Sequence, residues 1–363
     1  MSSEILSLPQ DSAQALRYLN EGRIEEDGQC WAVLPRERVL GQNGVEQVLF
    51  ERVRLELLSP PGRLQCMWRA IRPLSLTLTL GPILVTLAYG LAHRWPIASA
   101  GVGFLAALGA IFFQIAIHLF NDVEDYLRLI DLENSEGGSR VIRLGWVSAR
   151  SLRQWAYGAL ILGGLCGLPA LVARPQFLVG IGVGGLLGVL GYSNRPWGLK
   201  YRLLGDAVVF FLSGPLLTWG VSQALFAQSS PAVILLGIYF GLLSWAVLHS
   251  GNFQDIDLDS VRNFKTLANQ LGFSRSRHVF PLIYGLATGL LILGAFMGWI
   301  PWILNTQFLV VPGILYRFLA RIYEASGPAS ALLAGVRSHS LRIHLGLSAL
   351  MLVSLILTYA VLK

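Results

Sequence analysis

The sequence predicts an all-α, polytopic membrane protein with about nine transmembrane helices and a small N-terminal cytoplasmic appendage. Of the 363 residues, 54% are hydrophobic and only 13% are charged, whereas a soluble globular domain is usually about 25% charged. A chain of this composition cannot cover its surface with polar side chains. Its apolar residues also gather in repeated long runs, which favours a chain that crosses the lipid bilayer several times.

Nine apolar runs are long enough to span roughly 30 Å of hydrocarbon. We expect helices at Leu74–His93, Ile97–Phe120, Trp155–Val172, Phe177–Gly191, Asp206–Phe226, Ala232–His249, Val279–Ile300, Trp302–Leu319 and His344–Leu362. The fourth run is the shortest and is rich in glycine.

Lysine and arginine are distributed unequally between the connections. They are numerous after the even-numbered helices, whereas the connections after the first, third, fifth and seventh hold little beyond Arg94 and Arg174. Because cytoplasmic loops retain positive charge, this predicts a cytoplasmic N-terminus in an inner or plasma membrane. The net charge of +7 follows from the same bias and from contact with anionic lipid headgroups. It requires no nucleic-acid partner.

The first part of the chain differs in composition from the rest, which predicts an appendage at residues 1–65 and a membrane domain at residues 66–363. Within the appendage, a short helix is expected at Ala13–Glu21. Strands are expected at Cys30–Leu34 and Val45–Leu58, around a glycine-rich turn. The appendage contains no motif of known chemistry, which favours a structural or regulatory role.

Two similar acidic clusters interrupt the apolar sequence, each where a long apolar run ends. The first consists of Asn121, Asp122 and Asp125, with Asp131 further along. The second consists of Asn252, Asp255 and Asp259. Carboxylates near the depth of the bilayer are costly, so they are candidates for functional residues. An ion pathway through a transporter would place acids at the middle of spans, whereas these lie at the ends.

The spacing within each cluster predicts a shared face, because residues three or four apart are neighbours on a helix. Mg²⁺ takes oxygen ligands and is commonly held by one or two carboxylates together with substrate phosphates. Two such faces on neighbouring helices could therefore hold a diphosphate through Mg²⁺. For either cluster alone, a solvated helix end with ordinary acids is the alternative. The three cysteines, Cys30, Cys66 and Cys166, lack metal-ligand spacing.

Basic and aromatic residues follow the clusters in the expected cytoplasmic loops. The basic candidates are Arg140, Lys200 and Lys265, because Lys and Arg bind phosphate oxygens and stabilise a leaving group. Positive-inside bias is their competing explanation. Tyr192 could line a pocket that stabilises a cation or could anchor the chain at the interface. For His118 and His249, a buried hydrogen bond to a neighbouring helix is favoured over a role as general base.

The chain resembles the UbiA superfamily of intramembrane polyprenyltransferases in three motifs. They are Asn121-Asp122-x-x-Asp125, Asn252-x-x-Asp255-x-x-x-Asp259 and Arg262-x-x-Lys265-Thr266. The resemblance begins near Arg69 and is strongest to the 1,4-dihydroxy-2-naphthoate branch. In that branch the first motif continues as Asp-Tyr and is followed by a further Asp, as Asp125-Tyr126 and Asp131 do here. The sequence departs from the branch at Asp206, where the branch usually has Glu.

The resemblance implies helices around a central cavity that opens to the cytoplasmic side. It also implies that Mg²⁺ on a polyprenyl diphosphate is held by Asp122, Asp125, Asp255 and Asp259. Asn121 and Asn252 would orient these ligands, and Asp131 would join them. Arg140, Lys200 and Lys265 would bind phosphate oxygens, with Tyr192 among the substrate-binding residues.

The implied reaction is transfer of a polyprenyl group to an aromatic acceptor, either 1,4-dihydroxy-2-naphthoate or a similar quinone precursor. Another acceptor, of the 4-hydroxybenzoate, homogentisate, chlorophyllide or haem type, is the first alternative. A CDP-alcohol phosphotransferase is another alternative, but it would carry one compact acidic motif instead of two. A membrane transporter is the third.

Overall fold

The computed structural model describes residues 4–26, 28–41, 44–132 and 138–361. The chain forms two compact units, and neither is a single stretch of sequence. The first unit consists of Met1–Pro73 and Ile115–Leu160, and the second of Leu74–Gln114 and Ile161–Lys363. Helices α4 (Ala100–Leu127) and α5 (Ala149–Ala173) contribute residues to both units. The first unit therefore joins the expected appendage to the chain around the first acidic cluster.

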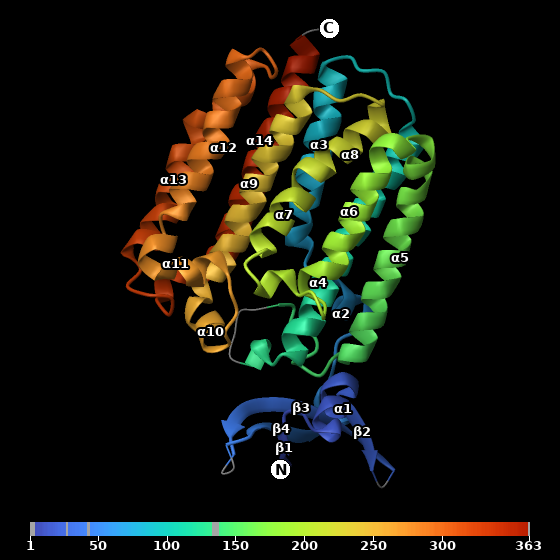
Figure 1. The fold of residues 1–363 in the computed structure, drawn as a ribbon, viewed down its shortest axis with the longest axis vertical. Coiled ribbons are helices and arrows are strands. Elements are labelled where there is room, and N and C mark those ends of the chain that lie inside the picture. Colours follow the sequence, from blue (N-terminus) through green and yellow to red (C-terminus); the bar gives the residue numbers. More distant parts are fainter. Residues whose placement is uncertain (1–3, 27, 42–43, 133–137, 362–363) are drawn as a thin grey trace. The chain divides into compact units, whose positions relative to one another are not determined.

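The first unit begins with a four-stranded antiparallel sheet (Figure 1). Its strands are β1 (Glu4–Pro9), β2 (Arg23–Glu26), β3 (Gln29–Leu40) and β4 (Glu46–Arg54), in the order β1-β4-β3-β2. Helix α1 (Ala13–Glu21) has the predicted bounds. It packs Tyr18 edge-on against Phe50, with ring centroids 5.6 Å apart. The predicted strands overlap β3 and β4, and part of the predicted turn, residues 42–43, lies outside the described residues.

A 3₁₀ turn, η1 (Leu55–Leu57), connects the sheet to α2 (Arg63–Ile71). The chain after α4 forms η3 (Ile130–Leu132) and then returns towards α5. Near Gly145, this return packs on the sheet domain. A Cβ atom at Gly145 would lie 2.9 Å from Leu58 Cδ1 and 3.2 Å from Leu34 Cδ2. The segment that follows the first acidic cluster is therefore in contact with the N-terminal sheet domain.

The second unit is a helix bundle arranged about α9 (Pro231–Gln254), which packs most extensively against four other helices (Figure 1). These are α7 (Gly205–Ser213), α8 (Pro215–Phe226), α12 (Val279–Phe296) and α14 (Val336–Val361). Glycine allows the closest approach, because a Cβ atom at Gly214 would lie only 2.4 Å from the carbonyl oxygen of Gly237. The predicted helix at Asp206–Phe226 divides at this glycine into α7 and α8.

Further helices and turns complete the second unit. They are η2 (Pro73–Leu76), whose first residue belongs to the first unit, α3 (Thr77–Ala92), α6 (Pro175–Ser193), η4 (Leu199–Tyr201), α10 (Ile256–Val261), α11 (Leu267–Ser276), η5 (Trp302–Thr306), α13 (Gln307–Glu324) and η6 (Ala331–Leu333). The core around α9 includes the fully buried side chains of Tyr239, Phe240, Phe280 and Phe318.

Eight helices in the described parts of the chain are long and apolar enough to cross a membrane. They overlap every predicted span except the eighth, Trp302–Leu319. There the chain forms η5 and then α13, which carries Arg317, Arg321 and Glu324 and is outside this set. The predicted count of nine spans is therefore not confirmed, whereas the polytopic helical fold is.

Candidate functional site

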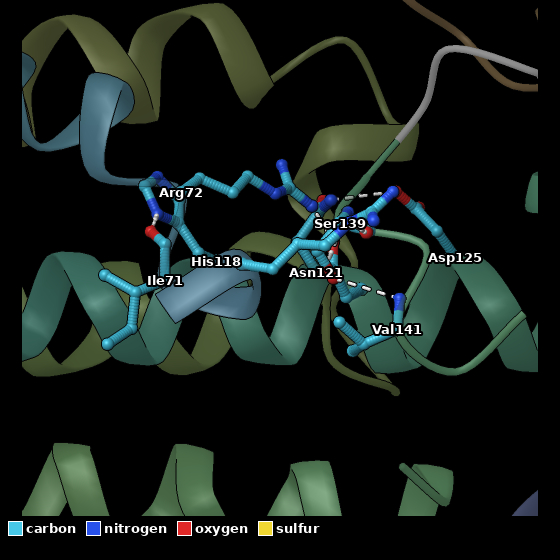
Figure 2. A network of polar contacts seen from close by, with 9 residues as sticks. Ile71, Arg72, His118, Asn121, Asp125, Ser139 and Val141 are labelled. Atoms are coloured by element: carbon cyan, nitrogen blue, oxygen red, sulfur yellow. Dashed lines mark hydrogen bonds and ion pairs between the residues drawn. The ribbon is translucent and has the colours of Figure 1, made fainter. Parts of the chain in front are cut away.

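Asn121 and Asp125 of the first cluster lie on one face of α4, as their spacing predicts. The helix continues to Leu127, so the two side chains are one turn apart. The Asn121 side-chain amide donates a hydrogen bond of 2.8 Å from Nδ2 to Asp125 Oδ2 (Figure 2). The Asp125 carboxyl group is buried, with 6% of the residue surface exposed. Asn121 therefore orients a buried carboxylate, which can act only as an acceptor when ionised.

Asp122 has different partners, because adjacent residues of a helix point in directions about 100° apart. Its Oδ1 atom forms an ion pair with Nη2 of Arg72, which directly follows α2. Its Oδ2 atom accepts a 3.1 Å hydrogen bond from the backbone N–H of Ser139. Asp122 is 3% exposed. This carboxylate thus connects three segments of the first unit: α4, the end of α2 and the loop after η3.

His118 and His249 are both buried and hydrogen-bonded to a neighbouring helix, as the sequence favours. His118 Nδ1 lies 2.9 Å from the carbonyl oxygen of Ile71, the last residue of α2 (Figure 2). His249 Nε2 lies 3.1 Å from the carbonyl oxygen and 3.0 Å from Oγ of Ser276. These contacts give both imidazole rings a structural role.

Arg140 lies in the loop that follows Ser139 and has a left-handed backbone with φ of 64°. Its side chain is half-buried, and its guanidinium group makes no hydrogen bond or ion pair with any residue that the structure describes. Asp131 belongs to η3, but its side chain is outside the described part of the chain. Arg140 is therefore the predicted basic residue of this unit whose charge is available to a ligand.

The second cluster lies in the second unit, at a change of direction between two helices. Helix α9 ends at Gln254, and α10 begins at Ile256. The sequence predicts one continuous helical face for Asn252, Asp255 and Asp259, whereas Asp255 occupies the junction. The helical bonding pattern nevertheless persists, since the Asp255 N–H donates to Gly251 O and the Asp259 N–H donates to Asp255 O.

Asp259 is held by the start of the next helix. Its Oδ2 atom accepts a 3.1 Å hydrogen bond from the hydroxyl group of Thr266. Thr266 is the N-cap of α11 and forms a reciprocal capping box with Asn269. Such a box satisfies backbone donors that the helix itself leaves unpaired. The residues after Asp259 are thus arranged by a local signal that is visible in the sequence.

The loops that carry Lys200 and Lys265 are joined by backbone hydrogen bonds. The Lys265 N–H donates to Tyr201 O at 3.1 Å, and Lys265 and Arg202 form a short parallel bridge. The rings of Tyr201 and Phe264 are 4.8 Å apart. Tyr192 is buried in the last turn of α6. The structure therefore brings together two of the predicted basic segments, which are distant in sequence.

Arg337 is a further basic residue near the second cluster that was not among the predicted site residues. It lies in the first turn of α14, and its guanidinium group packs against Gly251, the residue before Asn252. A Cβ atom at Gly251 would lie 2.9 Å from the Nε, Cζ and Nη2 atoms of its guanidinium group. In the sequence, the only sign of this contact was the glycine at position 251, and a glycine can be present for many other reasons. Arg72 was also missed, since no local pattern links it to α4.

The chemistry of the donors in both clusters suits Mg²⁺, because every candidate ligand is an oxygen atom. Within the described residues, no three His, Cys, Asp or Glu side chains lie together as a cage for a metal ion. Mg²⁺ usually keeps several waters and needs only one or two carboxylates beside substrate phosphates. A structural zinc site would instead require four closely spaced protein ligands.

Comparison with known proteins gives three findings. The model of the UbiA prenyltransferase family matches residues 79–344. The 1,4-dihydroxy-2-naphthoate octaprenyltransferase of Escherichia coli is 31% identical over 60% of this chain and 71% of its own length. The protein of the same name from Haemophilus influenzae is 26% identical over 74% and 88%, respectively. These matches confirm the resemblance to the naphthoate branch.

The fold is also similar to those of solved UbiA homologues. The structure of a UbiA homologue from Archaeoglobus fulgidus bound to GPP and Mg²⁺ has a TM-score of 0.61 and 16% identity, covering 81% of this chain and 99% of that one. A UbiA homologue from Aeropyrum pernix has a TM-score of 0.57 and 15% identity. At this identity the likeness concerns the fold alone.

Proposed function

Because the chain belongs to the UbiA prenyltransferase family, we propose that this integral membrane protein transfers a polyprenyl group from its diphosphate to an aromatic acceptor with the help of Mg²⁺. The observation that carries the proposal is the buried Asp125 carboxylate, oriented by Asn121 at 2.8 Å. Such a preorganised oxygen ligand at the end of a long apolar helix is costly to keep without a function. The second cluster repeats the same residue types in the second unit.

Of the four predicted Mg²⁺ ligands, this proposal keeps Asp125, Asp255 and Asp259, with Asn121 and Asn252 to orient them. It leaves out Asp122, whose carboxylate is paired with Arg72. When bound, Mg²⁺ would neutralise charge on the diphosphate. The Thr266 hydroxyl group fixes the Asp259 carboxylate through the 3.1 Å hydrogen bond. The participation of Asp131 stays a prediction.

Arg140, Lys200 and Lys265 would bind phosphate oxygens and stabilise the negative charge that develops as the carbon–oxygen bond breaks. The diphosphate leaves with the electron pair of that bond, and the prenyl carbon becomes an allylic cation. A ring carbon of the acceptor then attacks this cation and loses its proton. The ring of Tyr192 is a candidate to face the cation.

We propose 1,4-dihydroxy-2-naphthoate or a similar bicyclic phenolic acid as the acceptor. Support comes from the Asp125-Tyr126 and Asp131 spacing and from the names of the Escherichia coli and Haemophilus influenzae relatives. The proposed location is an inner or plasma membrane, with both clusters on the cytoplasmic side, since Lys and Arg concentrate in the loops that carry them.

The direct test offers the purified protein, in detergent or nanodiscs with Mg²⁺, a labelled prenyl diphosphate. Equal amounts of 1,4-dihydroxy-2-naphthoate and 4-hydroxybenzoate serve as competing acceptors, and the products are identified by mass. We expect a prenylated naphthoate product that the Asp125→Ala variant does not form. Exclusive prenylation of 4-hydroxybenzoate would overturn the proposed identity of the acceptor. No prenylated product from any member of a wider acceptor panel would overturn the proposed function.

A further inference from the structure

Both carboxylate oxygens of Asp122 have partners within the protein. Arg72 Nη2 neutralises its charge at Oδ1, and the Ser139 N–H occupies Oδ2 at 3.1 Å. The residue is 3% exposed. A carboxylate in this position would have to give up an ion pair in order to bind a metal ion as a charged ligand. The contacts of Asp122 instead fit a residue that holds other segments in place.

The peptide group of Ser139 is fixed on both sides by these partners. Its N–H donates to Asp122, and its carbonyl oxygen accepts a 3.0 Å hydrogen bond from Nε of Arg69 in α2. The Arg69 guanidinium group in turn lies 4.9 Å from the ring centroid of Trp146. Ser139 is 5% exposed. The loop is therefore attached to α2 and to α4 at a single peptide group.

The backbone on either side of Ser139 takes a conformation that needs such support. Gly138 and Arg140 have φ angles of 62° and 64°, a region that residues with a Cβ atom rarely adopt. Arg72 has a φ angle of 56° as well. Gly138 also leaves room for the ion pair, since its Cβ atom would lie 3.1 Å from Asp122 Oδ1 and 3.4 Å from Arg72 Nη2.

Arg140 comes directly after this fixed peptide group, and its guanidinium group has no partner among the residues that the structure describes. The charge of Arg72 is engaged by Asp122, whereas the charge of Arg140 is available. Fixing the Ser139 peptide group therefore also fixes the backbone position from which the Arg140 side chain extends. Residues that support a ligand from behind in this way can matter nearly as much as the ligands themselves.

We propose that Asp122 is a positioning residue and not a Mg²⁺ ligand: together with Arg72 it fixes the loop at residues 138–141 so that Arg140 meets the diphosphate of the substrate. This inference rests on the proposed function for the identity of the anion. It gives the two acids of the first cluster different roles. Asp125 binds the metal ion, and Asp122 positions Arg140.

The first experiment compares Asp122→Asn with Asp125→Asn as a matched pair of isosteric changes. Binding of Mn²⁺ to the purified protein is followed by electron paramagnetic resonance at saturating inorganic diphosphate. We expect Asp122→Asn to bind Mn²⁺ like the wild type, and Asp125→Asn to bind it about tenfold or more weakly. An equal loss of Mn²⁺ affinity in both variants would overturn the proposal.

The second experiment tests the route through Arg140 with a double-mutant cycle. Binding of inorganic diphosphate at saturating Mn²⁺ is measured for Arg72→Ala, Asp122→Asn, Arg140→Ala and the double variants with Arg140→Ala. Each single change should weaken binding by about tenfold, and neither Arg72→Ala nor Asp122→Asn should weaken it further once Arg140 is absent. Independent, multiplicative losses would refute the coupling.

Arg72→Ala keeps this test decisive if Asp122→Asn fails to fold, because it breaks the same ion pair from outside the acidic motif. Rescue by Arg72→Lys, which restores the charge at this site, would support the ion pair as its cause. Both binding measurements are independent of prenyl transfer. A protein that binds diphosphate as described but transfers no prenyl group would therefore refute the proposed function and leave this inference standing.

Discussion

Replacing Asn121 with alanine should raise the Mg²⁺ concentration that the reaction requires, without unfolding the protein. The Asn121 amide donates to the buried Asp125 carboxylate at 2.8 Å, which makes this a charge-assisted hydrogen bond. Such bonds contribute about 1.5–3 kcal/mol. If the bond serves to orient Asp125 for the metal, that free energy corresponds to a rise of about 10–150-fold in the Mg²⁺ concentration needed for half-maximal activity.

The assay is prenyl transfer by the purified variant over a Mg²⁺ titration that extends to saturation. Asn305→Ala is the matched control, since it removes a buried asparagine whose amide meets Leu291 O at 3.5 Å in the second unit. Its Mg²⁺ requirement should equal that of the wild type. A half-saturating Mg²⁺ concentration that stays the same in Asn121→Ala would refute the reasoning, because Asp125 would then need no orientation by Asn121.

Three further outcomes follow from the structure. Asp255→Ala should abolish prenyl transfer while the protein remains folded by circular dichroism, and full activity at saturating Mg²⁺ would contradict a role for the second cluster. Excess EDTA should stop turnover of the wild type and added Mg²⁺ or Mn²⁺ should restore it, so undiminished turnover in EDTA would exclude a divalent metal ion. Gly251→Ala should raise the KM for the prenyl diphosphate, because its Cβ atom would lie 2.9 Å from the Arg337 guanidinium group. Gly289→Ala, with no atom within 4 Å of its Cβ position, is the control, and an equal KM in both variants would show that Arg337 does not contribute to the site.

The membrane helices were predictable because long apolar runs have few other structural uses. The pairing of Asn121 with Asp125 was predictable for a similar reason, since α4 stays regular across both residues. The junction at Asp255 was not, because Gln254 to Ile256 contains neither proline nor glycine to mark the end of a helix. The spacing rule assumed a continuous helix there.

The contacts of Arg72 and Arg337 could not be predicted from local sequence patterns, for another reason. Both arginines reach segments that are distant in sequence, and in a membrane protein every loop arginine already has an explanation in the positive-inside bias. Sequence patterns identify which carboxylates deserve interest, whereas tertiary packing decides which cation each one meets. Asp122 and Asp125 show the difference, since they are alike in the motif and unlike in their partners.

The packing of Gly145 against Leu34 and Leu58 bears on how this protein can be cut or shortened. The N-terminal sheet domain is in contact with the chain that returns from the first acidic cluster, and both belong to one compact unit. Deleting the first 60 residues would therefore expose the apolar surroundings of a loop that carries Arg140. A truncated chain that still inserts into the membrane should lose amide protection from hydrogen exchange across residues 138–148, far from the site of the deletion in sequence.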